Sequence, residues 1–579
     1  MRKNLLLLLL SAVVFTASAQ NKIQSPDEFL GYKLGSRYTL HYRVAEYFRY
    51  IAANAPNVKL QQYGKTNEDR PLLAAFITSP ENSKRLEEIR RQNMDMVSGK
   101  ASGGTGLPIV WLSFNVHGNE ASSTEVAMQT LFDLVDPANT RTKPWLKNTV
   151  VVIDPCINPD GRDRYVNFYN PVHSRPVNPD PQSREHMEPW PGGRSSHYYF
   201  DLNRDWAWQT QKETQQRLAL FNTWLPEVHV DFHEQGYNAP YYFAPAAEPF
   251  HKFITPWQRE FQTTIGKNNA KYFDEKGWLY FTKERFDLLY PSYGDTYPIY
   301  NGSIGMTYEQ GGIRAGLAVI NSDGDTLTLT DRIAHHHSNA LATIETTSAN
   351  AKKVTDEFAK FFSNARNNPP GDYRSYIIKN DNTEMVKSLA TLLDRNGIEY
   401  GYGSSAAGGF GFNYVTGKDE RFSIAKNDLV INSYQAKSVL LNVLFEPRTT
   451  VVDSNTYDIT AWALPYAYGL KAYASKQSYK PASAKPEAVF TPQNLPSAPY
   501  AYVAPWNSVT SVRFLAKLLN TGVKVRYTET PLTGSGKNYP SGSLLITRAA
   551  NAALGQQLDQ LVRAVADSMQ ISLGTLSSG

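Results

Sequence analysis

The sequence predicts an α/β fold: a three-layer α/β/α domain with a mixed, largely parallel twisted sheet, followed by smaller α/β accessory domains. Two observations support this. From Ser25 to about Asn350, short apolar runs bounded by polar turns alternate with amphipathic segments, as in sheets covered by helices. The chain of 579 residues has room for two to four domains, and Pro-rich tracts divide its second half.

Four apolar runs predict strands of the first domain, at residues 72–79, 107–114, 149–156 and 227–233. Between them, residues 122–135 and 212–224 have the pattern of amphipathic helices. Functional side chains of parallel sheets gather at the carboxyl ends of strands. His117 and His233 lie at the ends of two of these runs, where that rule places a site.

Residues 1–19 are typical of a secretory signal peptide, with two basic residues, an apolar stretch and the small-residue triplet 17–19. The apolar stretch is too short to span a bilayer, and no other long apolar run follows. We therefore expect export to the periplasm or the extracellular space, with no membrane span. Because Cys156 is the single cysteine, no internal disulfide is expected.

Composition shifts predict the domain limits. We expect a catalytic domain at 20–363, an accessory α/β domain at 364–480 and a further α/β domain at 490–579. Residues 166–199, rich in Pro, Asn, Arg and aromatics, predict a long ordered loop, and 405–412 a Gly-rich loop without a phosphate cradle. A further strand is expected where the chain ends at "TLSSG".

The formal net charge of +5 is slight for this length, and no basic block is present, which disfavours nucleic-acid binding. The 35 Tyr and 10 Trp suit a peptide- or carbohydrate-facing surface, but they suit ordinary cores equally.

"FNVHGNE" (114–120) carries His117 and Glu120 three positions apart, directly after a predicted strand. A hydrolytic zinc site needs three ligands from His and carboxylates with one open position. This pair alone is common by chance. Four downstream segments add to it: "INPDGRDRY" (157–165), "FDLNRDW" (200–206), "VDFHEQG" (230–236) and "MTYEQGG" (306–312).

With these segments the chain resembles the funnel-type zinc metallocarboxypeptidases, the carboxypeptidase A-like peptidases. The family pattern is His-x-x-Glu, Asn-Pro-Asp-Gly, Asn-Arg, a third His and a Glu at a strand end, and all five parts occur here in order. The resemblance covers roughly residues 25–350. Each part is weak, but the ordered combination is specific.

The resemblance implies one zinc ion per chain, held by His117, Glu120 and His233. Asp201 is similar to the family's carboxylate that orients the first His ligand through its other ring nitrogen.

The resemblance also assigns the substrate-facing residues. Asn203 and Arg204 match the pair that grips the substrate's terminal carboxylate, for which a planar guanidinium is suited. Glu309 matches the general base, which takes a proton from the attacking water and delivers it to the leaving amine.

Two further family roles have several candidates. The Arg that stabilises the developing oxyanion matches Arg194 by spacing, with Arg164 and Arg184 as rivals. The mobile Tyr that covers the substrate matches Tyr290 best and Tyr293 second, ahead of Tyr297 and Tyr300. Asp295 is a candidate for the side-chain pocket, where it favours basic residues.

Other polar residues have simpler interpretations. His229, Asp231 and Cys156 fit packed strand positions, although Asp231 is also a candidate for orienting the site. The "HHH" tract (335–337) lies in a helical pattern, so its rings point in different directions, and a solvated helix face is expected. The last domain loosely resembles a glutamine-amidotransferase module and lacks the Cys for that chemistry.

The sequence therefore predicts an exported zinc metallocarboxypeptidase acting on peptides or proteins with a free C-terminus. Two alternatives stay open. The same site serves a cell-wall peptide amidase or an N-acyl amino acid deacylase. A non-catalytic peptide-binding protein on a peptidase scaffold is the alternative of another class. The oligomeric state is left open.

Overall fold

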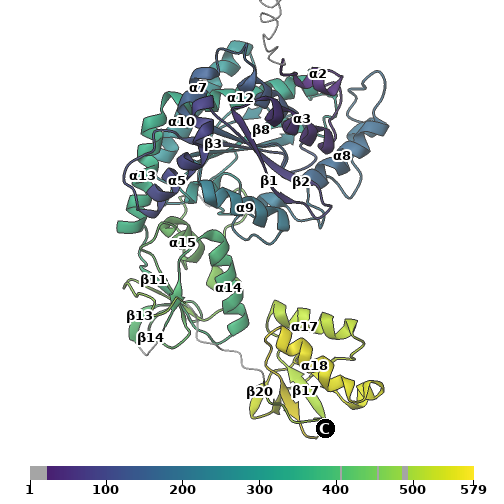
Figure 1. Ribbon diagram of the computed structural model, residues 1–579, viewed down its shortest axis with the longest axis vertical. Coiled ribbons are helices and arrows are strands. Elements are labelled where there is room, and N and C mark those ends of the chain that lie inside the picture. Colours follow the sequence, from purple (N-terminus) through teal and green to yellow (C-terminus); the bar gives the residue numbers. More distant parts are fainter. Residues whose placement is uncertain (1–21, 404–406, 453–454, 485–492, 579) are drawn as a thin grey trace, which may run out of the picture. The chain divides into compact units, whose positions relative to one another are not determined.

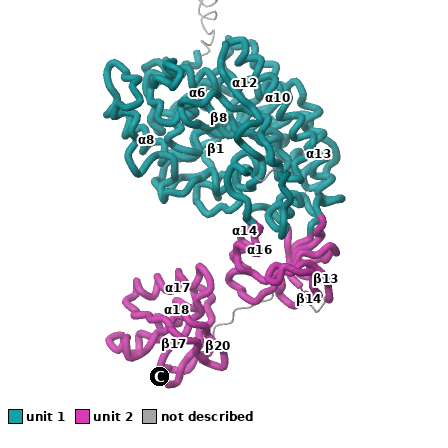
Figure 2. The backbone as a smooth tube through the Cα atoms, turned by 180° about the vertical axis from the view of Figure 1, so that it is seen from behind, with its two compact units in different colours: residues 1–371, 395–398, 433–462 teal, residues 372–394, 399–432, 463–579 magenta. Residues whose placement is uncertain are grey.

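The computed structural model describes residues 22–403, 407–452, 455–484 and 493–578, so the predicted signal peptide lies outside the described residues. The chain forms two compact units, teal and magenta in Figure 2. Unit 1 comprises residues 1–371, 395–398 and 433–462, and unit 2 comprises the rest. Within the described ranges, no helix is both long and apolar enough to cross a membrane.

Unit 1 is built on an eight-stranded mixed sheet in the order β1-β2-β4-β3-β5-β8-β6-β7 (Figure 1). The central neighbours β4, β3, β5 and β8 are parallel, and so is the β6–β7 pair, whereas β1–β2, β2–β4 and β6–β8 are antiparallel. Its strands are β1 (Val58–Lys65), β2 (Pro71–Ile77), β3 (Ile109–Phe114), β4 (Val150–Asp154), β5 (Val228–Gly236), β6 (Tyr241–Tyr242), β7 (Tyr280–Phe281) and β8 (Ile304–Ile313).

Helices cover both faces of this sheet, which confirms the three-layer prediction. One face carries α3 (His41–Asn54), α6 (Ser122–Val135), α10 (Pro256–Lys276) and α12 (Leu329–Ala349). The other carries α5 (Leu86–Ser98), α9 (Lys212–Trp224), α11 (Thr296–Tyr300) and α13 (Ala351–Asn367), with α15 (Ser438–Phe445) packed on α11 and α13. Smaller elements complete the unit: α2 (Pro26–Leu30), α4 (Pro80–Lys84), α7 (Lys143–Asn148), α8 (Pro159–Val172), η1 (Arg184–His186), η2 (Leu202–Arg204), β9 (Ala318–Ile320) and β10 (Thr326–Thr328).

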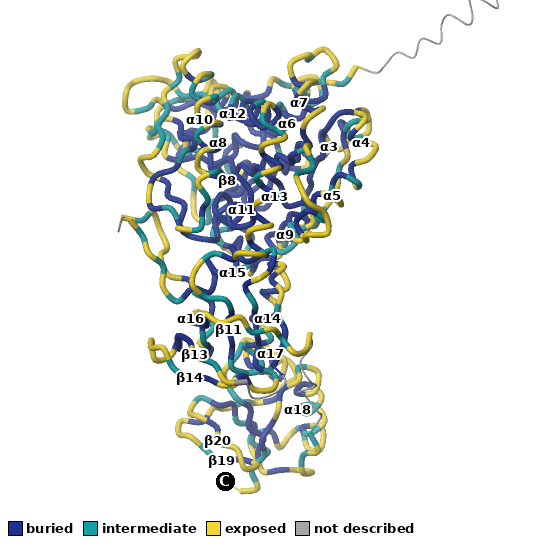
Figure 3. Tube along the Cα trace, turned by 90° about the vertical axis from the view of Figure 1, so that its left-hand side faces the viewer, coloured by how far each residue is buried: buried dark blue, intermediate teal, exposed yellow. Residues whose placement is uncertain are grey.

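Apolar burial and local caps explain these elements. The parallel strands β3 and β4 are buried throughout, and β8 lies in the dark-blue interior of Figure 3. Helices α10 and α12 each begin with a capping box, in which Thr255 pairs with Gln258 and Thr328 with Asp331. Such boxes satisfy backbone N–H groups that the first turn leaves free.

The structure corrects three expected boundaries. Helix α8 begins at Pro159 and runs to Val172, so the Pro-Asp-Gly motif is its first turn and the predicted loop starts only after it. Asn158 caps this helix, because its side chain accepts the N–H of Gly161. Helix α13 runs into the predicted linker, to Asn367. Residues 433–462, expected in the accessory domain, belong to unit 1.

Unit 2 contains a six-stranded sheet and a four-stranded sheet, both antiparallel throughout. The expected Gly-rich loop is strand β13 from Ala407 onward, and residues 405–406 lie outside the described residues. Near the chain end, Gly574–Leu576 forms strand β22 beside β17. The first sheet and its helices are β11 (Ser375–Ile378), α14 (Thr383–Asn396, whose last residues count with unit 1), β12 (Gly401–Tyr402), β13 (Ala407–Asn413), β14 (Asp419–Ile424), β15 (Leu429–Asn432), α16 (Leu464–Ala467) and β16 (Ala472–Ser475). The second part comprises β17 (Ala501–Ala504), α17 (Val509–Asn520), β18 (Arg526–Tyr527), the hairpin β19 (Leu532–Gly534) and β20 (Lys537–Tyr539), β21 (Leu544–Thr547), η3 (Ala549–Leu554), α18 (Gln557–Ser568) and β22.

Candidate metal centre and substrate cavity

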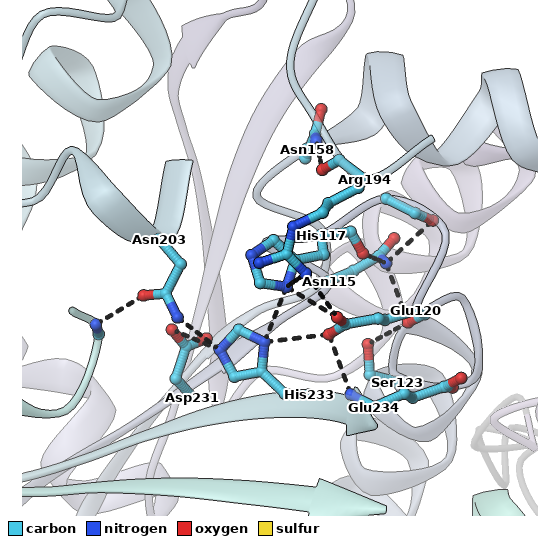
Figure 4. A network of polar contacts seen from close by, with 12 residues as sticks. Asn115, His117, Glu120, Ser123, Asn158, Arg194, Asn203, Asp231, His233 and Glu234 are labelled. Carbon is cyan, nitrogen blue, oxygen red and sulfur yellow. Dashed lines mark hydrogen bonds and ion pairs between the residues drawn. The ribbon is translucent and has the colours of Figure 1, made fainter. Parts of the chain in front are cut away.

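His117, Glu120 and His233 converge on one point beyond the central parallel strands (Figure 4). The Nδ1 atoms of the two His side chains lie 3.2 Å apart. The Glu120 carboxylate lies between them, with Oε1 2.7 Å from His117 Nδ1 and Oε2 3.0 Å from His233 Nδ1. All three side chains are buried, so two imidazoles and a carboxylate offer a compact set of nitrogen and oxygen donors to a metal.

Each imidazole has a carboxylate on its other nitrogen. His117 Nε2 lies 3.0 Å from Asp201 Oδ1, and His233 Nε2 lies 3.1 Å from Asp231 Oδ2. A carboxylate there fixes the ring and the tautomer, leaving Nδ1 free to bind metal. Asp231, for which the sequence left two interpretations open, therefore lies within ion-pair distance of a candidate ligand.

The turn that carries His117 and Glu120 is organised by Asn115, which has a left-handed backbone (φ 60°). Its side-chain Nδ2 donates to the carbonyls of His117 (2.8 Å), Gly118 (3.3 Å) and Glu120 (3.0 Å). Gly118 is required by close packing, since a Cβ there lies only 2.2 Å from the backbone of residues 161–162. The first turn of α8 therefore packs directly against the turn that carries the candidate ligands.

Glu309 lies beside this cluster on β8. His233 and Glu309 are paired positions of the parallel strands β5 and β8. Both residues lie inside their strands, because β5 and β8 continue past the strand ends that the sequence predicted. Burial, aided by the charge of Glu120, raises the pKa of Glu309 to about 7, against the opposing effect of nearby cationic groups.

These residues open into a cavity of about 170 Å³. Its lining includes the two candidate ligands His117 and Glu120, together with Glu309 and most predicted substrate residues, namely Arg194, Asn203 and Arg204. Further along are Gln235, Gly236, Arg285, Phe286, Asp287, Tyr293, Asp295, Thr307, Ile313 and Tyr457.

Arg194 is the arginine that lies nearest the candidate ligands. Its guanidinium is 3.3 Å from His117 Nδ1 and 3.6 Å from Glu120 Oε1, and it donates to Asp201 Oδ2 at 2.8 Å. The rivals lie elsewhere. Arg164 donates to the carbonyls of residues 192, 195 and 196, and Arg184 donates to Met187. Neither lines the cavity.

Asn203 and Arg204 lie in the short helix η2. Asn203 Nδ2 is 3.2 Å from His233 Nε2, and its Oδ1 accepts the N–H of Gly294 at 2.8 Å. Gly294 packs against Asp231, where a Cβ lies only 1.9 Å from the carboxylate. The Arg204 guanidinium stacks over the Tyr293 ring, 4.6 Å from its centre.

Tyr290, the preferred cap residue, does not line the cavity. Its hydroxyl accepts the Trp208 Nε1–H at 2.6 Å, and its ring packs in a buried apolar cluster. Tyr293 lines the cavity instead. Two further candidates, Tyr297 and Tyr300, are fully buried. The hydroxyl of Tyr297 binds Asn396, and that of Tyr300 binds the Leu289 carbonyl.

Asp295 is buried at the cavity wall, and burial raises its pKa to about 6. Of the residues expected to be structural, His229 is packed against Ser113 and Cys156 is buried, with burial raising the thiol pKa to about 12. The "HHH" rings do point in different directions, but His336 is buried beneath the site, with Nε2 3.1 Å from the His233 carbonyl.

Several contributors escaped the sequence patterns. Asn115 left no signal except its place before the His. Asn119 binds the Glu188 carboxylate at 2.8 Å, and Asn158 donates to the Arg194 carbonyl at 3.1 Å, so both hold the long loop near the site. Asp458 pairs with Arg204 at 2.8 Å. It lies 254 residues from that arginine along the chain, and no sequence pattern indicated it.

Comparisons with known proteins agree with this geometry over part of the chain. Residues 44–225 match the zinc carboxypeptidase family. No curated protein matches the sequence.

Three metallopeptidases are among the solved structures to which the chain shows partial similarity. A metallo-carboxypeptidase from Burkholderia cenocepacia has 13% identity and TM-score 0.39, covering 53% of this chain and 69% of that chain. Carboxypeptidase A from Helicoverpa armigera has 14% identity and TM-score 0.38, covering 61% and 82%. A metallo-carboxypeptidase from Pseudomonas aeruginosa has 11% identity and TM-score 0.37, covering 54% and 68%.

Proposed function

We propose that the protein is an exported zinc-dependent carboxypeptidase that removes C-terminal residues from peptides, and the match of residues 44–225 to the zinc carboxypeptidase family supports this. The observation that carries the proposal is the convergence of His117, Glu120 and His233 beside Glu309 in one cavity. His233 and Glu309 lie outside the matched segment, and the fold brings them to it.

The donor set fits zinc. Two neutral imidazole Nδ1 atoms and one carboxylate leave a coordination position open, and Asp201 and Asp231 support the two rings. His117, Glu120 and His233 would hold the zinc ion, which would supply Lewis-acid chemistry there: a polarised carbonyl and a lowered pKa for a bound water.

The protein's own residues supply the remaining steps. Glu309 accepts the proton of the attacking water and then protonates the leaving amine, which its raised pKa favours. Arg194 points its guanidinium at the same place and stabilises the negative charge that develops on the carbonyl oxygen.

Substrate selection rests on Asn203 and Arg204. The Arg204 guanidinium, buried against Tyr293, offers planar donors to a terminal carboxylate. Asn203, held by Gly294, sits between that arginine and His233. Tyr293 takes the place of Tyr290 as the residue that covers the bound substrate.

The test is to measure zinc content and hydrolysis together. The purified full chain should hold one zinc per chain and release single C-terminal residues from a peptide library, with amidated peptides resisting. Release of cell-wall stem fragments or acyl groups instead would favour the amidase or deacylase alternatives. Protein with neither zinc nor hydrolysis would support the non-catalytic alternative.

The export part of the proposal rests on residues 1–19 alone. N-terminal sequencing of protein secreted by a bacterial host should begin at residue 20.

A further inference from the structure

Asp458 holds the arginine that we assign to the substrate's carboxylate. Its Oδ2 accepts a hydrogen bond from Arg204 Nε at 2.8 Å and another from the Tyr293 hydroxyl at 2.9 Å. Both partners line the cavity. One carboxylate oxygen therefore sits on the guanidinium and on the tyrosine that face the substrate.

The segment that carries Asp458 is fastened to unit 1 on either side of this contact. Val451 and Trp462 pack with the Leu289–Tyr293 region in one apolar cluster. Trp462 Nε1 also donates to the Val443 carbonyl at 2.8 Å. Beside Asp458, the Tyr457 N–H binds Asp287 Oδ2 at 2.6 Å. These anchors direct Asp458 toward the cavity.

The Asp458 carboxylate contacts Arg204 and Tyr293 as the carboxylate of a substrate would. An arginine beside a tyrosine hydroxyl in a cavity is a site for a carboxylate, because the guanidinium offers fixed parallel donors and the phenol offers another. A substrate with a free C-terminus presents the same group as the Asp458 side chain. The two carboxylates repel each other and compete for the same donors.

We propose that Asp458 is a specificity-determining internal competitor, occupying on Arg204 and Tyr293 the place of the substrate's terminal carboxylate. Binding of a peptide then requires exchange of one carboxylate for the other. This inference rests on the proposed function, because it takes Arg204 to be the carboxylate site.

Partial exposure makes such an exchange feasible. The side chains of Asp458 and Arg204 are 35% and 26% exposed, so water can solvate Asp458 once it leaves. Ion pairs of this exposure contribute little to stability, up to about 1 kcal/mol. The competitor therefore weakens substrate binding by a modest factor and does not abolish it.

The experiment measures binding of uncleaved peptides to zinc-loaded protein in an E309Q background. Asp458→Asn, nearly isosteric and uncharged, should tighten binding of a peptide with a free carboxylate by about twofold to fivefold, the factor of a solvent-screened ion pair. The same peptide with an amidated C-terminus should bind both proteins equally. Asp323→Asn, an exposed change on the β9–β10 turn, is the matched control and should alter neither affinity.

The outcomes separate the two proposals. If neither protein prefers the carboxylate over the amide, Arg204 is not the carboxylate site and the proposed function fails with the inference. If both prefer it equally, only the inference is overturned. Weaker carboxylate binding by D458N also overturns it, because Asp458 then holds Arg204 in the productive position.

A kinetic test in a second background adds a readout of folding, because an unchanged kcat shows that D458N leaves the site intact. Tyr293→Phe keeps the ring under Arg204 and removes the hydroxyl that binds Asp458. If the proposal holds, adding D458N to Y293F still lowers the KM for free-carboxylate peptides in the active enzyme, with kcat little changed. An unchanged KM in this pair overturns it.

Discussion

His233 and Glu309 occupy paired positions on the neighbouring parallel strands β5 and β8. In a parallel pair, residues in register point to the same face, so a candidate metal ligand and the candidate base enter the cavity side by side. Sheet register therefore positions the chemistry: a one-residue slip of β8 turns Glu309 into the opposite face. His117 reaches the same place from the end of β3, which pairs with β5 on its other side.

Replacing Glu309 with Gln should reduce kcat by about a hundredfold or more, because the amide cannot accept the proton. Zinc should remain bound, since Glu309 is not among the three converging ligands. Steady-state kinetics with elemental analysis checks this. Near-normal turnover in metal-loaded E309Q would refute the general-base assignment.

The two carboxylates behind the His ligands should behave differently on conversion to amides. Asp231→Asn should weaken zinc affinity about tenfold to a hundredfold and leave the remaining kinetics of zinc-saturated enzyme near normal. Asp201→Asn should weaken zinc affinity similarly and also lower kcat, because Asp201 holds Arg194. Competition with a chelator measures the affinities. Equal kinetics of the two saturated variants would contradict the Arg194 assignment.

Asn115 should prove important for both stability and metal binding. Asn115→Gly keeps the left-handed backbone but removes three buried hydrogen bonds to carbonyls and the Oδ1 acceptor that faces Thr124 and Cys156, and we expect a loss of about 3–4 kcal/mol of unfolding free energy. Asn115→Ala should lose about 1 kcal/mol more, because alanine resists the positive φ. Denaturant unfolding gives both values. Identical stabilities for the two variants would show that the backbone conformation carries no cost.

The buried carboxyl group of Glu227 should make the stability of the protein fall as pH rises. Burial raises its pKa to about 8, and only one of its carboxyl oxygens has a described partner, the Ile109 N–H at 2.7 Å. The folded-state pKa is above the unfolded value of about 4.3, so its contribution is full below that pH and is lost as pH rises through 8.

Glu227→Gln mimics the neutral form and should remove this dependence. The variant should unfold at a higher temperature than the wild type, and the difference should grow from pH 5 to pH 9. The corresponding difference in unfolding free energy should reach a few kcal/mol at most. Thermal scans at both pH values test it, with Asp323→Asn as an exposed control. A constant difference between the proteins across pH would contradict the assignment.

Sequence patterns were informative where a local rule decides the outcome. The apolar alternation predicted helices 122–135 and 212–224 with the bounds that the structure has. The ordered motifs identified the converging metal ligands, because a strand end followed by a tight turn places His117 and Glu120 within reach of each other. Spacing also favoured Arg194 over its rivals, and Arg194 lines the cavity whereas Arg164 and Arg184 do not.

Spacing along the chain could not identify residues whose position depends on tertiary packing. Tyr290 and Tyr293 are three residues apart in an irregular segment, and only the partners of their hydroxyls separate them: Trp208 for one, Asp458 for the other. The loop was predicted to begin at residue 166, yet the helix that Asn158 caps runs on to Val172.

By itself, then, the sequence determined the layered α/β architecture of the first unit and the identity of the candidate zinc ligands, since both follow from periodicity and short-range motifs. Only the tertiary structure decided which carboxylate supports His233, which tyrosine faces the cavity, and that residues 433–462 fold back onto the first unit. Those outcomes depend on contacts between residues far apart in the chain. The Asp458–Arg204 pair spans 254 positions, and no local pattern encodes the match between two side chains at that separation.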